Sequence, residues 1–458
     1  MPASVAQADG RPDPWYPEAQ PASPRERPLT ETPPTALIRR DDVTVQVLEH
    51  RFIERVANGA CAVSERLNLP FTRLDLDHIL NAAKRKTGLS DWGDERFMVG
   101  LEETLKVVGE TAYTPLARVF IANICIRAVV HRLRIEQWFK DHPDALDIPI
   151  EKPLFVLGFP RTGTTVMQNM LEQASHRRAL QFWELTSPIP FHADLERDRR
   201  ARIKRIESDL FWAYRFVPEM GEVHEVKATT AEECWPLLSN TFNVVNFDIC
   251  HGLKPYGHWL MEQDMEWAYR EYRRMLQMLL WRIPAQQLVL KCPEHLWAVD
   301  SLLKVFPDAC IAWTHRAPFD CIASYSSMIS LSRRTLQGKI VPADIGPHIA
   351  DRFNTGVTRA MAARAAHGDE SRFFDVPFSE LIQDRVGMVH RIEEYFGLAQ
   401  TDGTLLQGWL DQERADARGK HRYDPAMWGL TPDAINGQFA DYIERFGIDV
   451  GGTDEGAP

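Results

Sequence analysis

The sequence predicts an α/β fold in which a parallel β-sheet is covered by helices on both faces. From Pro153 onward, short apolar runs alternate with helical stretches, which is typical of such a sheet. The first of these runs leads through a glycine turn into a helix, an arrangement that favours binding of an anion. The chain has 458 residues, 44% of them hydrophobic, so it is long enough to bury a substantial core.

The part of the chain before the sheet is predicted to be a tail followed by a helical region. Residues 1–36 are rich in proline, alanine and charge, which predicts a disordered tail. Residues 37–150 are predicted to be helical, because apolar residues recur there at spacings of three and four. The expected helices are Val43 to Val56, Leu74 to Ala83, Phe97 to Val108 and Leu116 to Phe139. The dipeptide His142-Pro143 predicts the end of the last one.

Residues 151–450 are predicted to form the α/β domain. A long, mostly helical insertion, residues 191–281, is expected to cover the C-terminal edge of the sheet, where open α/β folds bind ligands. A helix over 432–446 and a flexible tail, 451–458, are expected at the end. The predicted strands are Leu154 to Leu157, Gln287 to Leu290, Cys310 to Thr314 and Phe373 to Val376.

Composition excludes several classes of function. A net charge of −11 argues against a general nucleic-acid binder, which needs a basic excess. The seven cysteines include no Cys-x-x-Cys pair, so they predict neither a disulfide framework nor a zinc site. The longest apolar stretch, Val119 to Val130, contains Arg127 and is shorter than the roughly 20 residues of a spanning helix. With no transmembrane segment or signal peptide expected, the predicted location is the cytoplasm.

A phosphate-binding loop is predicted after the first strand of the sheet. Leu154 to Leu157 run into Gly158-Phe159-Pro160-Arg161-Thr162-Gly163-Thr164-Thr165 and then into a helical stretch over 166–173. The backbone amides and the helix N-terminus favour an anion, and Thr164 and Thr165 add hydroxyl donors. Arg161 adds a planar guanidinium that suits the oxygens of a phosphosulfate. The lysine of a nucleoside-triphosphate loop is replaced by Thr164, which argues against a magnesium nucleotide.

A second anion site is predicted after the strand that begins at Cys310. That strand leads into His315-Arg316-Ala317-Pro318, and a helical segment containing Ser324 follows. Arg316 and Ser324 are placed to approach one phosphate from two sides.

Taken together, the two sites resemble those of sulfotransferases. Pro160 to Thr165 is similar to their 5′-phosphosulfate loop, and Arg316 with Ser324, eight residues on, is similar to their 3′-phosphate site. Leu290 to Leu296 and Phe306 to Ala309 also resemble the family. The resemblance is closest to the bacterial sulfotransferase-like family with a long helical N-terminal region.

The resemblance implies a P-loop-like fold and 3′-phosphoadenosine 5′-phosphosulfate as co-substrate, with no metal. Arg161, Thr162, Gly163, Thr164 and Thr165 would bind the phosphosulfate, and Arg316 and Ser324 the 3′-phosphate. Lys420 and Arg422 loosely match a basic loop that closes over the nucleotide. Val166 replaces the tryptophan that cytosolic members place there, so adenine stacking must come from other residues.

Sulfuryl transfer needs a base for the acceptor proton and a cation for the transferring oxygens. Glu184 is the leading candidate for the base, because its place resembles that of the catalytic glutamate in protein-tyrosine and heparan sulfotransferases. His295 is its rival and His224 a third candidate, while Lys291 is predicted to stabilise charge on the oxygens. Glu232 and Glu233 are predicted only to interact with a helix dipole.

The sequence leaves two other functions open. A P-loop kinase or NTPase would need a loop lysine and an acidic metal ligand after a neighbouring strand, and neither is present at the expected places. A catalytically inactive nucleotide-binding protein is the other alternative. The acceptor, whether a small molecule, a lipid or a glycan, is not predicted, and a homo-oligomer is possible.

Overall fold

A computed structural model describes residues 35–40, 43–223, 225–416 and 424–450, and these residues belong to one compact unit. Its central sheet has the strand order β4-β5-β3-β6-β8, and all neighbouring strands are parallel. The strands are β3 (Leu154–Gly158), β4 (Arg177–Ala179), β5 (Gln287–Lys291), β6 (Cys310–His315) and β8 (Phe373–Pro377). Four of them confirm the prediction. The fifth, β4, has only three residues, two of them arginines, and shows no apolar run in the sequence.

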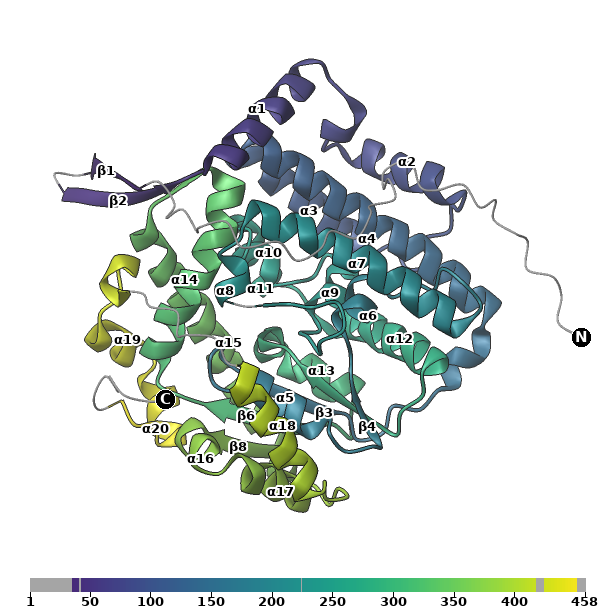
Figure 1. Ribbon diagram of the computed structural model, residues 1–458, viewed down its shortest axis with the longest axis vertical. Helices are drawn as coiled ribbons and strands as arrows, with labels where there is room; N and C mark the ends of the chain where they lie inside the picture. Colours follow the sequence, from purple (N-terminus) through teal and green to yellow (C-terminus); the bar gives the residue numbers. More distant parts are fainter. Residues whose placement is uncertain (1–34, 41–42, 224, 417–423, 451–458) are drawn as a thin grey trace, which may run out of the picture. The chain divides into compact units, whose positions relative to one another are not determined.

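Alternate residues of β3 face two different hydrophobic cores, as the period of a strand requires. Leu154 and Val156 pack with Met167 and Leu171 of α5 (Thr164–Leu171) and with residues of α17 (Arg385–Tyr395). Phe155 and Leu157 belong instead to the larger core on the opposite face. The sheet is therefore the middle layer of three, which confirms the predicted α/β fold (Figure 1).

The larger core is shared with the N-terminal helices. These are α1 (Phe52–Arg66), α2 (Leu76–Thr87), α3 (Phe97–Glu110) and α4 (Pro115–Asp141). The helices predicted over the last three are confirmed, and α4 ends directly before His142-Pro143. Buried residues of α4, including Ile121, Val129 and Leu133, join the same cluster as Phe155 of the sheet. The N-terminal helices and the sheet therefore have one continuous core.

The prediction of a helix from Val43 to Val56 was wrong for the first half of that range. Val43–Glu49 is a strand, β2, paired antiparallel with β1 (Thr35–Arg40) and with β7 (Lys339–Ile340), and α1 begins at Phe52. The sequence Val-Thr-Val-Gln-Val alternates with a period of two and is rich in β-branched residues, which favours a strand. β1 also includes two residues of the predicted tail, whose other residues lie outside the described part.

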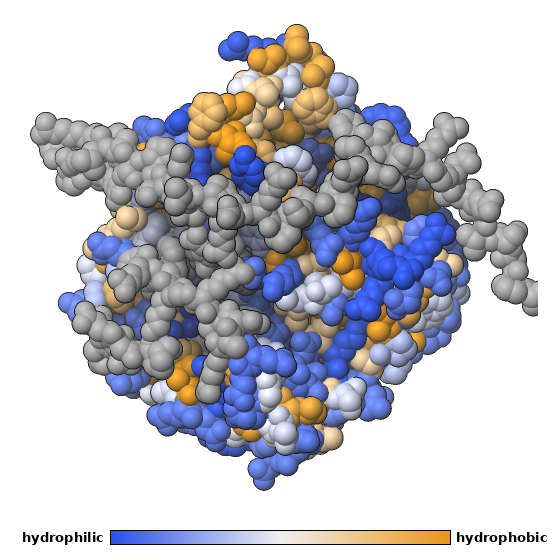
Figure 2. Space-filling view, in the orientation of Figure 1, coloured by the Kyte–Doolittle hydropathy of each residue, from blue (hydrophilic) through white to orange (hydrophobic). Residues whose placement is uncertain are grey.

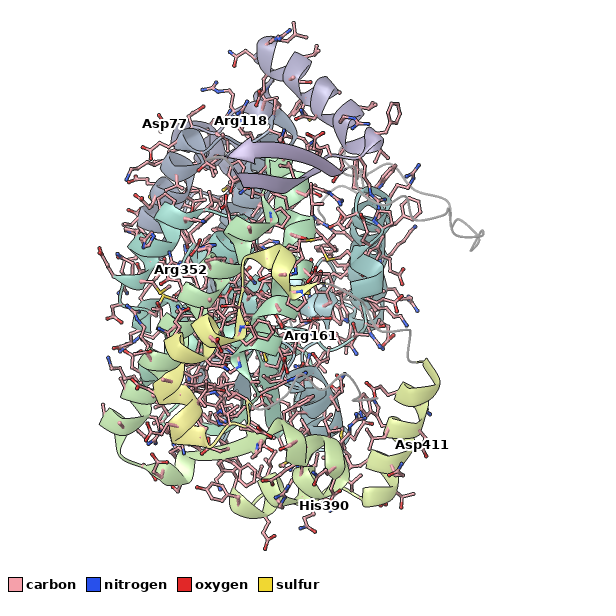
Figure 3. The ribbon with its side chains drawn as sticks, turned by 90° about the vertical axis from the view of Figure 1, so that its left-hand side faces the viewer. Asp77, Arg118, Arg161, Arg352, His390 and Asp411 are labelled. Atoms are coloured by element: carbon pink, nitrogen blue, oxygen red, sulfur yellow. The ribbon has the colours of Figure 1, made fainter. Side chains whose placement is uncertain are left out.

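One face of α1 carries exposed apolar side chains. Phe52, Val56, Val63 and Leu67, the residue after the helix, are each more than half exposed. They lie where the upper end of the molecule is orange in Figure 2. The opposite side of α1 is fixed by Glu65, which pairs with Arg118 of α4 (labelled in Figure 3).

The insertion is mostly helical, as predicted. Its helices, with α6 just before it, are α6 (Phe182–Thr186), α7 (Leu195–Phe216), α8 (Met220–Val223), α9 (Trp235–Leu238), α10 (Asn246–Ile249), α11 (Lys254–Met261) and α12 (Glu266–Arg282).

Helices that follow β5 complete the three layers. They are α13 (Val299–Val305), α14 (Pro318–Gln337), α15 (Ile345–His367), α16 (Phe378–Gln383), α17 and α18 (Gly403–Asp416). The helix predicted over 432–446 is broken at Phe439 into α19 (Pro432–Gln438) and α20 (Ala440–Phe446). None of the helices in the described ranges is long and apolar enough to cross a membrane.

Candidate functional site

The loop between β3 and α5 has an unusual backbone. Gly158 has φ 142°, Gly163 has φ 85° and Arg161, a residue with a side chain, has φ 74°. A Cβ atom on Gly158 would lie 2.1 Å from Oγ1 of Thr314, so this position requires glycine. A left-handed arginine costs roughly 1 kcal/mol, and such strain is commonly found at binding sites.

The hydroxyl of Thr162 fixes the loop through contacts inside the protein. Its side chain is fully buried, and its Oγ1 donates to the carbonyl of Phe159 at 2.6 Å. The same oxygen lies 2.5 Å from Oγ1 of Thr314 on β6. Thr162 is predicted to bind the phosphosulfate, but its hydroxyl is directed into the protein, so only its backbone amide remains for a ligand.

The open side of the loop presents donors. The side chains of Arg161 and Thr165 are exposed, while Thr164 is buried at the first position of α5. The first amides of a helix have no intrahelical partner, so those of Thr164 and Thr165 are available to an anion. Figure 3 labels Arg161 on this loop.

The two predicted anion sites lie side by side. Arg316, in the turn after β6, donates from Nη1 to the carbonyl of Arg161 at 3.1 Å. Its guanidinium lies 4.3 Å from the ring centre of Phe378, and its Nη2 is 3.3 Å from Asp320. Ser324, half-buried on α14, lies about 9 Å along that helix from its first residue.

The strand end before Arg316 is fixed by α20. Nδ1 of His315 lies 3.0 Å from the hydroxyl of Tyr442, and the imidazole stacks on Phe446 at 3.9 Å. On the other side, Nε2 of His315 lies 2.9 Å from Asp375. Burial lowers the pKa of His315 despite this carboxylate, so the imidazole is neutral at physiological pH.

Tyr442 also reaches the phosphate loop. Its ring centre lies 5.4 Å from that of Phe159, which is itself almost fully buried. One side chain of α20 therefore touches both the loop that carries Arg161 and the strand end that precedes Arg316.

Lys291, at the end of β5, forms an ion pair that the sequence did not predict. Its side chain is 1% exposed, and its Nζ donates to Oε1 of Glu233 at 3.2 Å. Burial lowers the pKa of this lysine and the carboxylates of Glu233 and Glu232 raise it, with a net rise. Lys291 is therefore charged, as its predicted role requires.

Glu233 does not lie at the start of a helix, contrary to the prediction. The helix begins at Trp235, and the backbone of residues 228–232 runs antiparallel to 180–183 through the bridge between Gln181 and Ala231. This arrangement brings Glu233 to the end of β5. No local spacing in the sequence signals its contact with Lys291, 58 residues further along the chain.

Glu184, the predicted base, is almost fully buried. Its Oε1 accepts a hydrogen bond from Arg178, and its Oε2 accepts one from the backbone amide of Gln181 at 3.0 Å. It thus caps its own short helix, α6. Each oxygen of a carboxylate has two acceptor positions, so one on each remains free.

His295 lies inside the larger core. It has no exposed surface, its Nδ1 lies 2.7 Å from the hydroxyl of Tyr269, and its ring packs edge-on against Phe155 at 5.1 Å. Burial lowers its pKa to about 3. This position gives an acceptor no access to the imidazole and argues against His295 as the base. His224, Lys420 and Arg422 lie outside the described residues.

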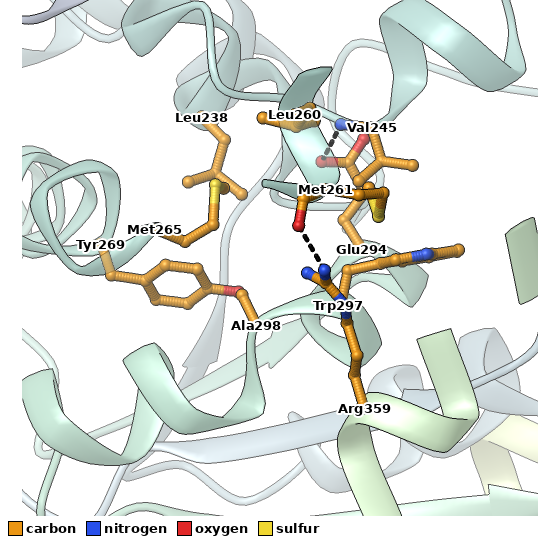
Figure 4. A pocket seen from close by; sticks show the side chains of 10 residues that line it. All are labelled: Leu238, Val245, Leu260, Met261, Met265, Tyr269, Glu294, Trp297, Ala298 and Arg359. Carbon is orange, nitrogen blue, oxygen red and sulfur yellow. Dashed lines mark hydrogen bonds between the residues drawn. The ribbon is translucent and has the colours of Figure 1, made fainter. Parts of the chain in front are cut away.

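A small cavity near Glu294 is unsuited to a substrate (Figure 4). Its volume of about 10 Å³ has room for roughly one water molecule. Glu294 accepts hydrogen bonds from the backbone amides of Val245 and Asn246, and burial raises its pKa to about 8.

A loop of backbone amides at a helix N-terminus, with two arginines beside it at the C-terminal edge of a parallel sheet, is typical of phosphate-binding α/β proteins. Residues 153–402 match the model of the sulfotransferase family. The chain therefore belongs to the sulfotransferase family, whose members transfer a sulfuryl group to an acceptor.

Solved structures agree with this assignment. Sulfotransferase STF1 from Mycobacterium tuberculosis is 29% identical, with a TM-score of 0.71 over 80% of this chain and 98% of that one. Sulfotransferase STF9 from Mycobacterium avium is 28% identical, with a TM-score of 0.73 over 83% of this chain and 99% of that one. No curated protein matches the sequence.

Proposed function

We propose that this sulfotransferase uses 3′-phosphoadenosine 5′-phosphosulfate and binds it across the two adjoining anion sites. The amides of the loop and the guanidinium of Arg161 would hold the phosphosulfate, with Arg316 and Ser324 on the 3′-phosphate. The contact between Arg316 and the carbonyl of Arg161 carries the proposal, because it joins the two sites into one surface. A single nucleotide with phosphates at both ends of its ribose suits such a surface.

In the proposed reaction, the acceptor oxygen attacks sulfur while the bond from sulfur to the 5′-phosphate oxygen breaks. The products are a sulfate ester and 3′-phosphoadenosine 5′-phosphate. Lys291 is charged and lies at the C-terminal edge of the sheet beside β3, so it would stabilise negative charge on the transferring group. Glu184 would take the acceptor proton.

Glu233 is a second candidate for the base, on one specific observation. Its side chain is 27% exposed and is paired with Lys291, whereas that of Glu184 is 3% exposed and is held by Arg178. A base that is partly open to solvent is easier for an acceptor hydroxyl to reach. Substitution of each glutamate in turn distinguishes the two candidates for the base.

Binding of 3′-phosphoadenosine 5′-phosphate, measured by calorimetry with EDTA present, tests the donor site. Arg161→Ala and Arg316→Ala are each expected to weaken binding by about 2 kcal/mol, as for a lost charge-assisted contact. Arg391→Ala is the control, because Arg391 forms an exposed ion pair with Glu380 on α17 and α16. No binding by the wild type, or equal binding by all variants, would overturn the proposal.

A further inference from the structure

A second, larger cavity lies between the N-terminal helices and the insertion. Its volume is about 140 Å³, and an engineered apolar cavity of about 150 Å³ is known to hold one benzene molecule. One wall is a single face of α4, with Phe120, Ile124, Arg127, Ala128 and His131 at helical spacing. The cavity has room for one aromatic ring or a short alkyl chain.

Other lining residues belong to the segments that carry the residues of the proposed reaction. Thr186, two residues after Glu184, lines the cavity, and so does Trp235, two residues after Glu233. The backbone amide of Cys234, between Glu233 and Trp235, donates to the carbonyl of Lys291 at 3.1 Å. A group bound in the cavity therefore lies beside the segments that carry both candidate bases and against the one that is tied to Lys291.

The lining is aromatic and almost uncharged. His251 stacks on Phe247 at 5.5 Å and meets the edge of Phe120 at 6.3 Å. Burial lowers the pKa of His131 to about 3 and that of His251 to about 4, so both imidazoles are neutral. His131 pairs with Asn240 at 3.0 Å, and the hydroxyls of Ser239 and Thr186 donate to backbone carbonyls.

The charged group in this lining is the guanidinium of Arg127. Its side chain is 43% exposed, and its Nη1 lies 3.7 Å from Asp209 of α7. The described residues that line the cavity include no carboxylate. A cationic group in the cavity would therefore find no carboxylate among the lining residues, and Asp209, outside the lining, is already paired with Arg127.

The wall formed by α4 lies outside the part of the chain that the family model covers. That part begins at residue 153, and α4 ends at Asp141. The shared sulfotransferase machinery and this wall thus come from different regions of the chain.

We infer that the cavity receives the apolar body of the acceptor, a ring or short chain without positive charge, and that α4 selects the acceptor through it. This inference rests on the proposed function. The hydroxyl of the bound acceptor would attack sulfur as described above, and its proton would go to the base.

The test measures sulfuryl transfer from 3′-phosphoadenosine 5′-phosphosulfate to 4-propylphenol and to tyramine, which differ in a cationic amine. We expect the wild type to use 4-propylphenol with a kcat/KM at least ten times higher than that for tyramine. Ile124→Trp fills the cavity from a half-buried position and should raise the KM for 4-propylphenol at least tenfold, with kcat little changed. Asn123→Trp, at the exposed neighbouring position, is the matched control and should behave as wild type.

Phe120→Ala, at a half-exposed position, gives a second variant that does not depend on tolerance of a larger side chain, and it should also raise this KM. Equal use of the two phenols, no use of either, or an unchanged KM in both cavity variants would overturn the inference. Calorimetry with 4-propylphenol alone separates the two proposals. If the wild type does not bind 3′-phosphoadenosine 5′-phosphate but binds 4-propylphenol through Ile124, the proposed function fails and the cavity remains a binding site for apolar groups.

Discussion

Gly158 is the residue of the phosphate loop at which the structure tolerates substitution least. Its φ is 142°, and Oγ1 of Thr314 lies only 2.1 Å from the place that the Cβ atom of an alanine would occupy. Gly158→Ala is expected to lower the free energy of unfolding by roughly 2 kcal/mol or more and to abolish nucleotide binding. Thermal unfolding and calorimetry measure the two effects. Gly408→Ala, where a Cβ would meet nothing within 4 Å, is the control.

Comparison of Glu184→Gln with Glu233→Gln identifies which glutamate acts as the general base. Loss of a general base is expected to lower kcat by about 10²-fold to 10⁴-fold, with little effect on the affinity for 3′-phosphoadenosine 5′-phosphate. We expect this result for Glu184→Gln. The same loss in Glu233→Gln alone would transfer the role to Glu233.

Glu172, at the end of α5, makes stability depend on pH. Burial raises its pKa to about 7, although the backbone amide of Ala179 opposes this. An acid with a raised pKa stabilises the folded state fully below its unfolded pKa, and this stability is lost as the pH rises through 7. Glu172→Gln keeps an acceptor for the amide of Ala179 but cannot ionise. Between about pH 4.5 and 7, the free energy of unfolding of the variant should therefore fall less than that of the wild type, by on the order of 2 kcal/mol. Urea unfolding at several pH values measures it, and an unchanged slope would contradict the assignment.

At the residue scale, the sequence pointed to candidate site residues where a local turn marks them. Arg161 and Arg316 could be selected as candidates because each follows a strand with a recognisable turn. The contact of Glu233 with Lys291 could not be predicted, because it depends on an antiparallel contact between 228–232 and 180–183 that no local pattern signals. His295 looked like a base in the sequence because burial by the surrounding core is not visible there.

At the element scale, β4 is held to α17 by a fully buried ion pair between Arg177 and Glu393. Both side chains are 0% exposed, and Glu393 also accepts from Thr401. Glu393→Gln leaves the arginine charge buried without its carboxylate and is expected to cost about 3–5 kcal/mol. Replacing both residues with apolar ones should cost less. Denaturant unfolding compares the single and double variants, with the exposed pair of Glu380 and Arg391 as control.

The strands of the central sheet were predictable and those of the small sheet were not. Central strands such as Cys310–His315 are buried on both faces, so they read as continuous apolar runs. The pairing of β2 with β7 joins residues nearly 300 positions apart, and β7 has only two residues. The small sheet therefore forms through tertiary contacts rather than through the intrinsic strand propensity of its residues.

At the scale of the whole molecule, the N-terminal helices and the sheet are expected to unfold together. Their apolar residues belong to one cluster that extends from Leu48 to Tyr442. A protein that begins at residue 150 should therefore lack stable tertiary structure, although it contains the whole region that the family model matches. Circular dichroism of this fragment, and a single thermal transition for the full chain, are the measurements. Two separate transitions in the full chain would contradict the prediction.

The position of Tyr442 has a consequence for the order of events during synthesis. A ribosome releases the phosphate loop long before it releases α20, since roughly 280 residues separate Phe159 from Tyr442 and translation adds about 5–20 residues per second. Until α20 emerges, Phe159 and His315 both lack the side chain that packs against each of them. The nascent enzyme should therefore acquire its affinity for the proposed donor only after α20 has left the ribosome, long after the phosphate loop itself.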